Sequence, residues 1–257
     1  MRFCYISTIN SLNEISSLGD IEYALAPYIL DSEEYCDYFR HQSQKDKIII
    51  VDDKIAENGG ELSFVNLIKA AVKVKATFLV IPDSIGNYKE TKKKREEFLN
   101  KHYDTIRGYG IKLLGVAQGS TFQEYIDSLD ELKDCFQVSL IGLPFRMRYA
   151  DFKNLTKEEN CMMNRYLFIQ SQKFNKPVHL LGCNLIKESL IYLNDKRIFS
   201  MDSKLITRYA LSNQKINFKD KVKPKKKLYI EDKLTKKQIK LAIDNIIKFK
   251  QEVEKYG

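Results

Sequence analysis

The chain has 257 residues, of which 44% are hydrophobic and 30% are charged. This length and balance predict a soluble globular protein in which residues 1–257 form a single domain with a full core. No apolar stretch approaches the roughly 20 residues needed to span a bilayer, and the start, MRFCYIST, lacks a signal-peptide pattern. We therefore expect a cytoplasmic protein with no membrane partner.

The formal net charge of +9 weakly favours a polyanionic partner. Two segments concentrate the charge. The run from Lys89 to Glu97 has interleaved glutamates and is typical of a solvated helix face. The run from Lys219 to Lys227 has no acid after Asp220 and contains a proline, so it cannot form a regular helix. We expect this run to contact phosphates through Lys223, Lys225, Lys226 and Lys227.

Cysteine and histidine spacing argues against a metal site. The five cysteines lie far apart with no CxxC pair, which predicts reduced thiols. The three histidines fall in no metal-like pattern with them. We predict no metal and no cofactor. No feature of the sequence predicts an oligomeric state.

Eight short apolar runs without alternation predict strands that are covered on both faces, as in a parallel sheet. In chain order they are Phe3–Ser7, Tyr23–Ala26, Lys47–Val51, Thr77–Ile81, Lys112–Ala117, Gln137–Leu143, Val178–Leu181 and Arg197–Met201.

Helical patterns follow most of these runs. We expect helices at 61–74, 88–109, 121–135, 156–174, 185–193 and 234–256, the last closing the chain. Ser120 with Gln123, Thr156 with Glu159 and Thr235 with Gln238 have the spacing of helix caps. The segment 203–233 is predicted to be irregular and basic.

Eight strands alternating with helices favour an α/β (β/α)8 TIM-type barrel with a basic extension and a C-terminal helix. An open doubly wound sheet is the alternative. An open sheet that binds a dinucleotide is disfavoured, because no GxGxxG motif follows a predicted strand. The Gly59-Gly60 pair lies well past the end of its strand.

Barrel active sites lie at the carboxyl ends of the strands. Asp52, Asp83 and Asp202 follow apolar runs at such ends, whereas no histidine, cysteine or lysine does. We interpret His179, inside a strand, as a buried, hydrogen-bonded core residue. Carboxylates alone suit chemistry at an acetal-like carbon, where one attacks and another moves a proton; N-glycosidic bonds belong to this class.

A second group of strand-end residues could read a purine. A carboxylate such as Asp83 accepts from the N1 and N2 donors of guanine, while the Gln118 amide and a glycine N–H donate to its acceptors. Gly142 has no side chain, so its backbone can approach a flat ring.

Six ordered segments at the strand ends resemble the motifs of guanine transglycosylases, over roughly residues 45 to 213. They are VDD (51–53), IPDSIGNY (81–88), GVAQGS (115–120), IGLP (141–144), HLLG (179–182) and MDSKLITRYA (201–210). Members of this family exchange a guanine in a polynucleotide for a 7-deazaguanine base without breaking the backbone.

The resemblance implies roles for individual residues. Asp202 is implied as the nucleophile that attacks C1′, and Asp52 as the general acid/base. Arg208, in the Thr-Arg pair after the nucleophile, is implied to contact phosphate or a neighbouring base. The residues implied to bind the substrate base are Asp83, Gln118, Gly119, Gly142, Leu143 and Gly182.

The chain also departs from the family pattern. Residues 52–56 read DDKIA where the family has D-S-G-G-F or D-S-G-A-F, and the cysteine-rich zinc subdomain of the tRNA enzymes is missing. We therefore prefer DNA over tRNA as the polymer, as in the shortened zinc-free branch found in phages and bacterial modification systems. If phage-encoded, the protein would act in the host cytoplasm.

Three alternatives remain open at this point. They are a tRNA-guanine transglycosylase, a nucleoside or base hydrolase that uses the same carboxylates, and a non-catalytic barrel that binds nucleic acid. The incoming base is expected to be a 7-deazaguanine such as 7-cyano-7-deazaguanine.

Overall fold

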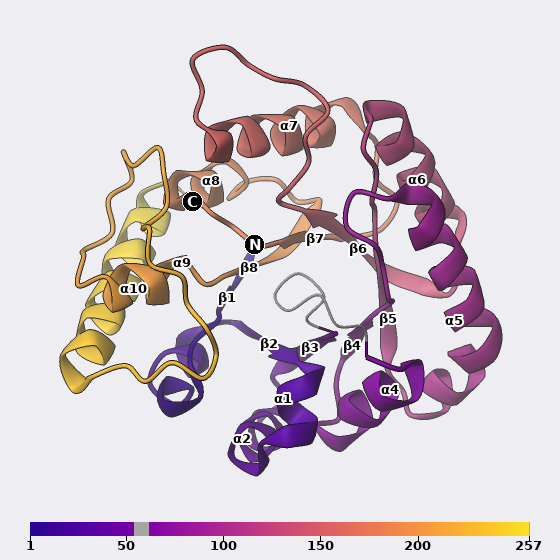
Figure 1. The fold of residues 1–257 in the computed structure, drawn as a ribbon, viewed down its shortest axis with the longest axis horizontal. Coiled ribbons are helices and arrows are strands. Elements are labelled where there is room, and N and C mark those ends of the chain that lie inside the picture. Colours follow the sequence, from indigo (N-terminus) through magenta and orange to yellow (C-terminus); the bar gives the residue numbers. More distant parts are fainter. Residues whose placement is uncertain (54–61, 257) are drawn as a thin grey trace.

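The computed structural model describes residues 1–53 and 62–256, and shows a ring of parallel strands surrounded by helices (Figure 1). Every strand lies within two residues of a predicted run at both ends. The strands are β1 Arg2–Tyr5, β2 Ile21–Leu25, β3 Ile48–Asp52, β4 Phe78–Val80, β5 Lys112–Val116, β6 Val138–Pro144, β7 Val178–Leu181 and β8 Ile198–Ser203.

The strand order makes the sheet a nearly closed barrel. It runs β1-β8-β7-β6-β5-β4-β3-β2, all parallel, so β1 and β2 are its two ends. These end strands lie next to each other: the Asp20 N–H, just before β2, donates to the Phe3 carbonyl of β1 at 2.8 Å. The Phe3 N–H donates back to Asp20 Oδ2 at 2.9 Å. The predicted TIM-type barrel is confirmed, and the open doubly wound alternative is wrong.

Helices cover the outside of the ring. They are α1 Ala26–Asp31, α2 Glu33–Gln44, α4 Phe64–Lys73, α5 Tyr88–Gly108, α6 Phe122–Asp134, α7 Lys157–Ser171, α8 Ile186–Ile191, α9 Leu205–Leu211 and α10 Lys236–Tyr256, with 3-10 turns at Ile9–Ser11 and Ser16–Leu18. Two helices, α1 and α2, were not predicted from the sequence. Pro27 lies in the first turn of α1, and the Ser32 hydroxyl caps α2 by accepting from the Tyr35 N–H. Within the described residues, no helix is both long and apolar enough for a membrane span.

Two of the three predicted caps are confirmed. Thr156 and Glu159 form a reciprocal capping box at α7, and Thr235 and Gln238 exchange the equivalent bonds before α10. The Ser120–Gln123 cap is wrong by one residue. Thr121 caps α6 by accepting from the Glu124 N–H, and Ser120 instead donates its hydroxyl and N–H to the Glu124 carboxylate.

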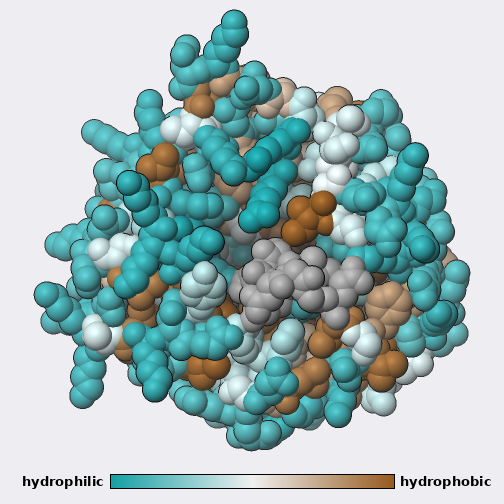
Figure 2. Space-filling view, viewed as in Figure 1, coloured by the Kyte–Doolittle hydropathy of each residue, from teal (hydrophilic) through white to brown (hydrophobic). Residues whose placement is uncertain are grey.

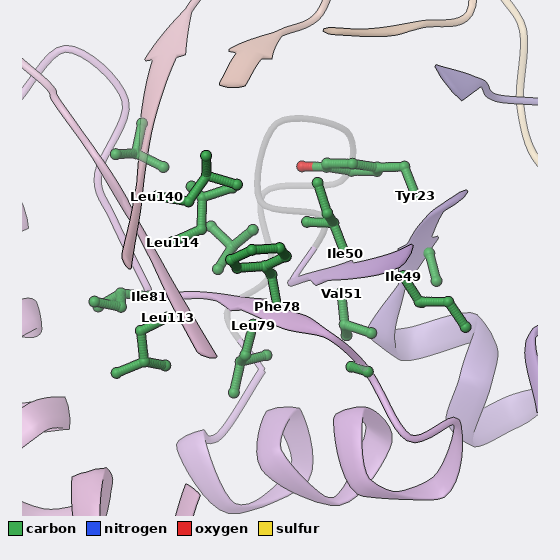
Figure 3. Packing of buried hydrophobic residues seen from close by; sticks show 14 of the residues in the cluster. Tyr23, Ile49, Ile50, Val51, Phe78, Leu79, Ile81, Leu113, Leu114 and Leu140 are labelled. Atoms are coloured by element: carbon green, nitrogen blue, oxygen red, sulfur yellow. The ribbon is translucent and has the colours of Figure 1, made fainter. Parts of the chain in front are cut away.

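Side chains alternate between the inside of the barrel and the layer beneath the helices. Figure 3 shows Tyr23, Ile50 and Phe78 pointing to one side of the sheet, whereas Val51 and Leu79 point to the other, toward a helix. All five are buried, which explains why the runs lack polar alternation. Because the side-chain period is two, Asp52 shares the inner face with Ile50.

The segment 203–233 is only partly irregular, contrary to prediction. Its first part contains α9, because the apolar residues of LITRYAL pack into a second core cluster with α10 and β1. Phe249 of α10 meets Phe3 of β1 edge-to-face at 4.9 Å. Residues 212–233 have turns and bends but no helix or strand.

The charged run in α5 is less solvated than expected. Arg95 is buried and pairs with Glu131 of α6, and Lys92 and Tyr88 also bond to that carboxylate. These contacts fasten α5 to α6, while Lys89 and Lys93 remain exposed.

Candidate active site

The three predicted aspartates lie at the carboxyl-terminal mouth of the barrel. Asp52 is the last residue of β3, Asp202 lies near the end of β8, and Asp83 follows β4. Burial is the main cause of the raised pKa of both Asp52 and Asp83; charge on Asp202 adds to the rise at Asp52, and charge on Asp52 adds to the rise at Asp83. Asp52 therefore lies within electrostatic range of both Asp83 and Asp202.

Asp52 is held on both oxygens. The Tyr23 hydroxyl donates to Oδ2 at 2.7 Å, and the Asp53 N–H donates to Oδ1 at 2.9 Å. Burial raises the pKa of the carboxyl, these hydrogen bonds oppose the rise, and Asp202 adds to it. A carboxyl that keeps its proton to higher pH suits a group that gives and takes a proton.

Asp202 is anchored through a single oxygen. Its Oδ1 accepts from the Gly182 N–H at 2.8 Å and lies 3.2 Å from His179 Nε2. His179 Nδ1 is 2.7 Å from the Ser200 hydroxyl, so both ring nitrogens have partners. The side chain of Asp202 is 8% exposed. These contacts fix the orientation of the carboxylate, as a nucleophile requires.

Asp83 and Gln118 bind each other. Gln118 Nε2 donates to Asp83 Oδ2 at 2.7 Å, and Gln118 Oε1 accepts from the Gly86 N–H at 3.0 Å. Burial, with the nearby charge of Asp52, raises the pKa of Asp83 to about 7. The two side chains predicted to read the base thus lie together and bond to each other.

The other predicted base-binding positions have clear packing roles. A Cβ on Gly142 would lie 2.8 Å from Leu114 Cδ2 and 3.0 Å from Leu181 Cδ1. A Cβ on Gly119 would lie 2.9 Å from the Tyr125 backbone nitrogen of α6. Leu143 is fully buried and, next to Gly142 in β6, faces away from the barrel interior. Only its backbone could reach a ligand.

Gly182 holds the candidate nucleophile. Its φ of +65° lies in the left-handed region, which glycine adopts without strain. In this conformation its N–H reaches Asp202, while its carbonyl accepts from Arg165 Nη2 at 3.2 Å. The structure therefore gives Gly182 a contact with Asp202 that the sequence analysis did not expect.

A buried ion pair lies behind the mouth and was also missed. Arg165 and Glu188 have fully buried side chains, with Arg165 Nε and Nη2 at 2.9 and 2.6 Å from Glu188 Oε1. Arg165 Nη1 also donates to the carbonyls of Leu143 at 3.2 Å and Leu181 at 3.0 Å. One guanidinium thus ties the ends of β6 and β7 together beneath Gly182.

The basic segment is attached to the rim of the barrel. Arg208 of α9 donates to the backbone carbonyls of Lys226, at 3.1 Å, and Pro224. Lys223 Nζ lies 3.5 Å from Glu158 Oε1, and burial and the charge of Arg208 lower its pKa. Lys225, Lys226 and Lys227 are exposed. Figure 2 shows mainly hydrophilic residues on the left of this face, over α10 and the irregular segment before it.

Sequence reasoning recognised the carboxylates but not all their partners. His179 is buried and hydrogen-bonded, as predicted, yet one of its partners is Asp202. Nothing in the sequence marks Tyr23 as a partner of Asp52, because tyrosine is common in buried strands. Lys54, Ile55 and Ala56, where the family pattern fails, and Gly59-Gly60 lie outside the described residues.

No group of three or more histidine, cysteine, aspartate or glutamate side chains within residues 1–53 and 62–256 is placed to hold a metal ion. The cysteines in this part of the chain are free thiols. Comparison with protein-family models found no match, and comparison with curated proteins found none.

Proposed function

We propose that the protein is a base-exchange transglycosylase that replaces guanine in DNA with a 7-deazaguanine such as 7-cyano-7-deazaguanine. One observation carries the proposal: Asp52, Asp83 and Asp202 meet at one mouth, each with a different set of hydrogen-bond partners. Two carboxylates for the reaction and one for the base are what exchange at a nucleotide needs.

In the proposed reaction Asp202 attacks C1′ of the target nucleotide. The C1′–N9 bond breaks, and Asp52 gives its proton to the leaving guanine. An ester between Asp202 and C1′ then holds the sugar. Asp52, now ionised, takes the N9 proton of the incoming base, whose nitrogen attacks C1′ and releases Asp202. No phosphodiester bond changes. The raised pKa of Asp52 supports its proton-carrying role.

Base recognition falls to Asp83 and Gln118 in this scheme. When a purine enters, Asp83 would accept from its N1–H and N2–H groups and Gln118 would donate to an acceptor on the ring. Both side chains would exchange their mutual hydrogen bond for bonds to the base, so little polar interaction would be lost on binding.

Exposed lysines support a polynucleotide as the substrate. Lys225, Lys226 and Lys227 lie beside the rim of the mouth, where they can contact phosphates. A target in a duplex must be flipped into the mouth, at a cost of a few kcal/mol. We prefer DNA to tRNA as the polymer because the five cysteines within these 257 residues form no cluster like the zinc-binding one that the tRNA enzymes carry.

The decisive experiment incubates the protein with DNA or tRNA and 7-cyano-7-deazaguanine, followed by mass spectrometry of the nucleosides. We expect the new base in DNA. Asp202→Asn should reduce incorporation at least about 1000-fold while DNA binding persists, because the isosteric amide cannot form the ester.

Each alternative predicts a different product. Incorporation into tRNA alone would identify a tRNA enzyme. Abasic sites without incorporation would identify a hydrolase. DNA binding with neither product, in the wild type and Asp202→Asn alike, would identify a binding barrel and refute the proposal.

A further inference from the structure

Two aromatic rings meet inside the barrel beneath the candidate site. Tyr23 of β2 and His179 of β7 stack with ring centroids 5.9 Å apart and an interplanar angle of 12°. His179 is fully buried and Tyr23 is 6% exposed, so neither ring is available to a large ligand. Their role must therefore be exerted through the groups that they contact.

Each ring contacts one of the two carboxylates assigned to the reaction. The Tyr23 hydroxyl donates to Asp52 Oδ2 at 2.7 Å, and His179 Nε2 lies 3.2 Å from Asp202 Oδ1. Ser200 holds the far side of the histidine ring through Nδ1 at 2.7 Å. A continuous series of contacts thus runs from Asp52 through the two stacked rings to Asp202.

We propose that Tyr23 and His179 are positioning residues that set the relative placement of Asp52 and Asp202. This inference rests on the proposed function, because it assigns the two rings to the reaction that those carboxylates perform. Neither ring touches the substrate in this scheme.

The strand arrangement explains why such a bridge is needed. Asp202 is paired across the β1–β8 ladder with Cys4, and Asp52 across the β2–β3 ladder with Leu25. The strand order places β1 and β2 at opposite ends of the sheet, so the two carboxylates stand on either side of the closing seam. The stacked rings of Tyr23 and His179 form a side-chain contact across this seam, between β2 and β7.

Three substitutions separate the elements of the bridge. Tyr23→Phe keeps the ring and removes the hydroxyl. His179→Phe keeps the stack and removes both hydrogen bonds. His179→Gln keeps a donor toward Asp202 and removes the ring. The matched control is Tyr38→Phe, because the Tyr38 hydroxyl also donates to a buried carboxylate, Glu22 Oε1 at 3.0 Å, but away from the mouth.

The main readout is the single-turnover rate of covalent adduct formation between the protein and DNA, with the KM for DNA measured in parallel. Tyr23→Phe and His179→Phe should each lower the rate on the order of 10- to 100-fold with KM unchanged, because each removes a hydrogen bond to a carboxylate. His179→Gln should recover part of the loss. Tyr38→Phe should stay within about 2-fold of wild type.

The double variant Tyr23→Phe with His179→Phe tests the connection between the rings. If the bridge acts as a unit, its rate should exceed the value expected from multiplying the two single losses. Multiplicative losses, or rates within about 2-fold of wild type for both single variants, would overturn the inference.

A second measurement does not depend on base exchange. With aspartate labelled by ¹³C at the carboxyl carbon, Tyr23→Phe and His179→Phe should each shift the Asp52 signal, whereas Tyr38→Phe should not. An Asp52 signal unmoved by His179→Phe also overturns the bridge. If wild-type protein exchanges no base but the signal moves as expected, the proposed function fails while the bridge stands.

Discussion

Replacing Gly182 by alanine tests whether this residue orients the candidate nucleophile. The φ of +65° puts alanine in the left-handed region, where a side chain costs about 1–2 kcal/mol. A Cβ there would find its nearest neighbour, Phe145 Cβ, at 3.9 Å, so the cost comes from the backbone rather than from a clash. Relieving the strain would turn the N–H away from Asp202 Oδ1, which now lies 2.8 Å from the Gly182 nitrogen.

Gly110 provides a matched control. Its φ is +73°, a Cβ there would meet nothing within 4 Å, and it precedes β5 at the opposite end of the barrel from the mouth. Gly110→Ala and Gly182→Ala should therefore lose similar stability, about 1–2 kcal/mol. In a chain of this length, the melting temperature should fall by roughly 2 to 8 °C in both.

Activity should separate the two variants. Gly182→Ala should slow adduct formation on the order of 10- to 100-fold, the value of a hydrogen bond to a charged group, whereas Gly110→Ala should leave the rate within about 2-fold of wild type. Thermal unfolding and single-turnover assays on the same preparations measure both effects. Equal melting temperatures and equal rates in the two variants would refute the role of the Gly182 N–H.

Two other predictions concern pH and salt. Because the pKa of Asp83 is raised to about 7, the KM for the incoming base should fall as pH rises through 7, since only the carboxylate accepts two hydrogen bonds; Asp83→Asn should bind the base poorly at every pH. The folded state binds this proton more tightly than the unfolded chain, whose aspartates have a pKa of about 4. The free energy of unfolding should therefore fall as pH rises from about 4 to 7 because of Asp83. Urea titrations should show a smaller fall over this range in Asp83→Asn than in the wild type. Replacing Lys225, Lys226 and Lys227 together by alanine should weaken DNA binding. The slope of the logarithm of the DNA-binding constant against the logarithm of the salt concentration should fall by up to about 3 in magnitude. The control replaces three exposed lysines of α4 and α5 by alanine and should change neither quantity: Lys69, Lys89 and Lys93. Equal slopes for the two triple variants would remove the basic segment from the binding surface.

The sequence was most informative where hydrophobic burial decides the structure. All eight strands follow from unbroken apolar runs, because a parallel sheet covered by helices buries both faces of each strand. The positions of Asp52, Asp83 and Asp202 at the mouth follow from the same runs, since each aspartate comes at or just after a strand end.

Features that depend on contacts between distant segments could not be read in advance. Arg165 looks like one more charged residue in a helical pattern, and only the fold places it against Glu188 and three backbone carbonyls. The helix α9 was missed because its apolar residues are explained only by their packing on α10. Gly182 was interpreted as a substrate contact, and its bond to Asp202 depends on a φ angle that the sequence does not specify.

The attachment of Arg208 has a consequence for how the lysine-rich segment can work. Because its guanidinium binds the carbonyls of Pro224 and Lys226, the main chain around the three exposed lysines is restrained before any ligand arrives. A segment that is already restrained loses little conformational entropy when it binds a polymer. Less of the electrostatic attraction is then offset by the cost of ordering the segment. Under the proposed function, the same restraint would fix where these three positive charges lie relative to a bound polymer.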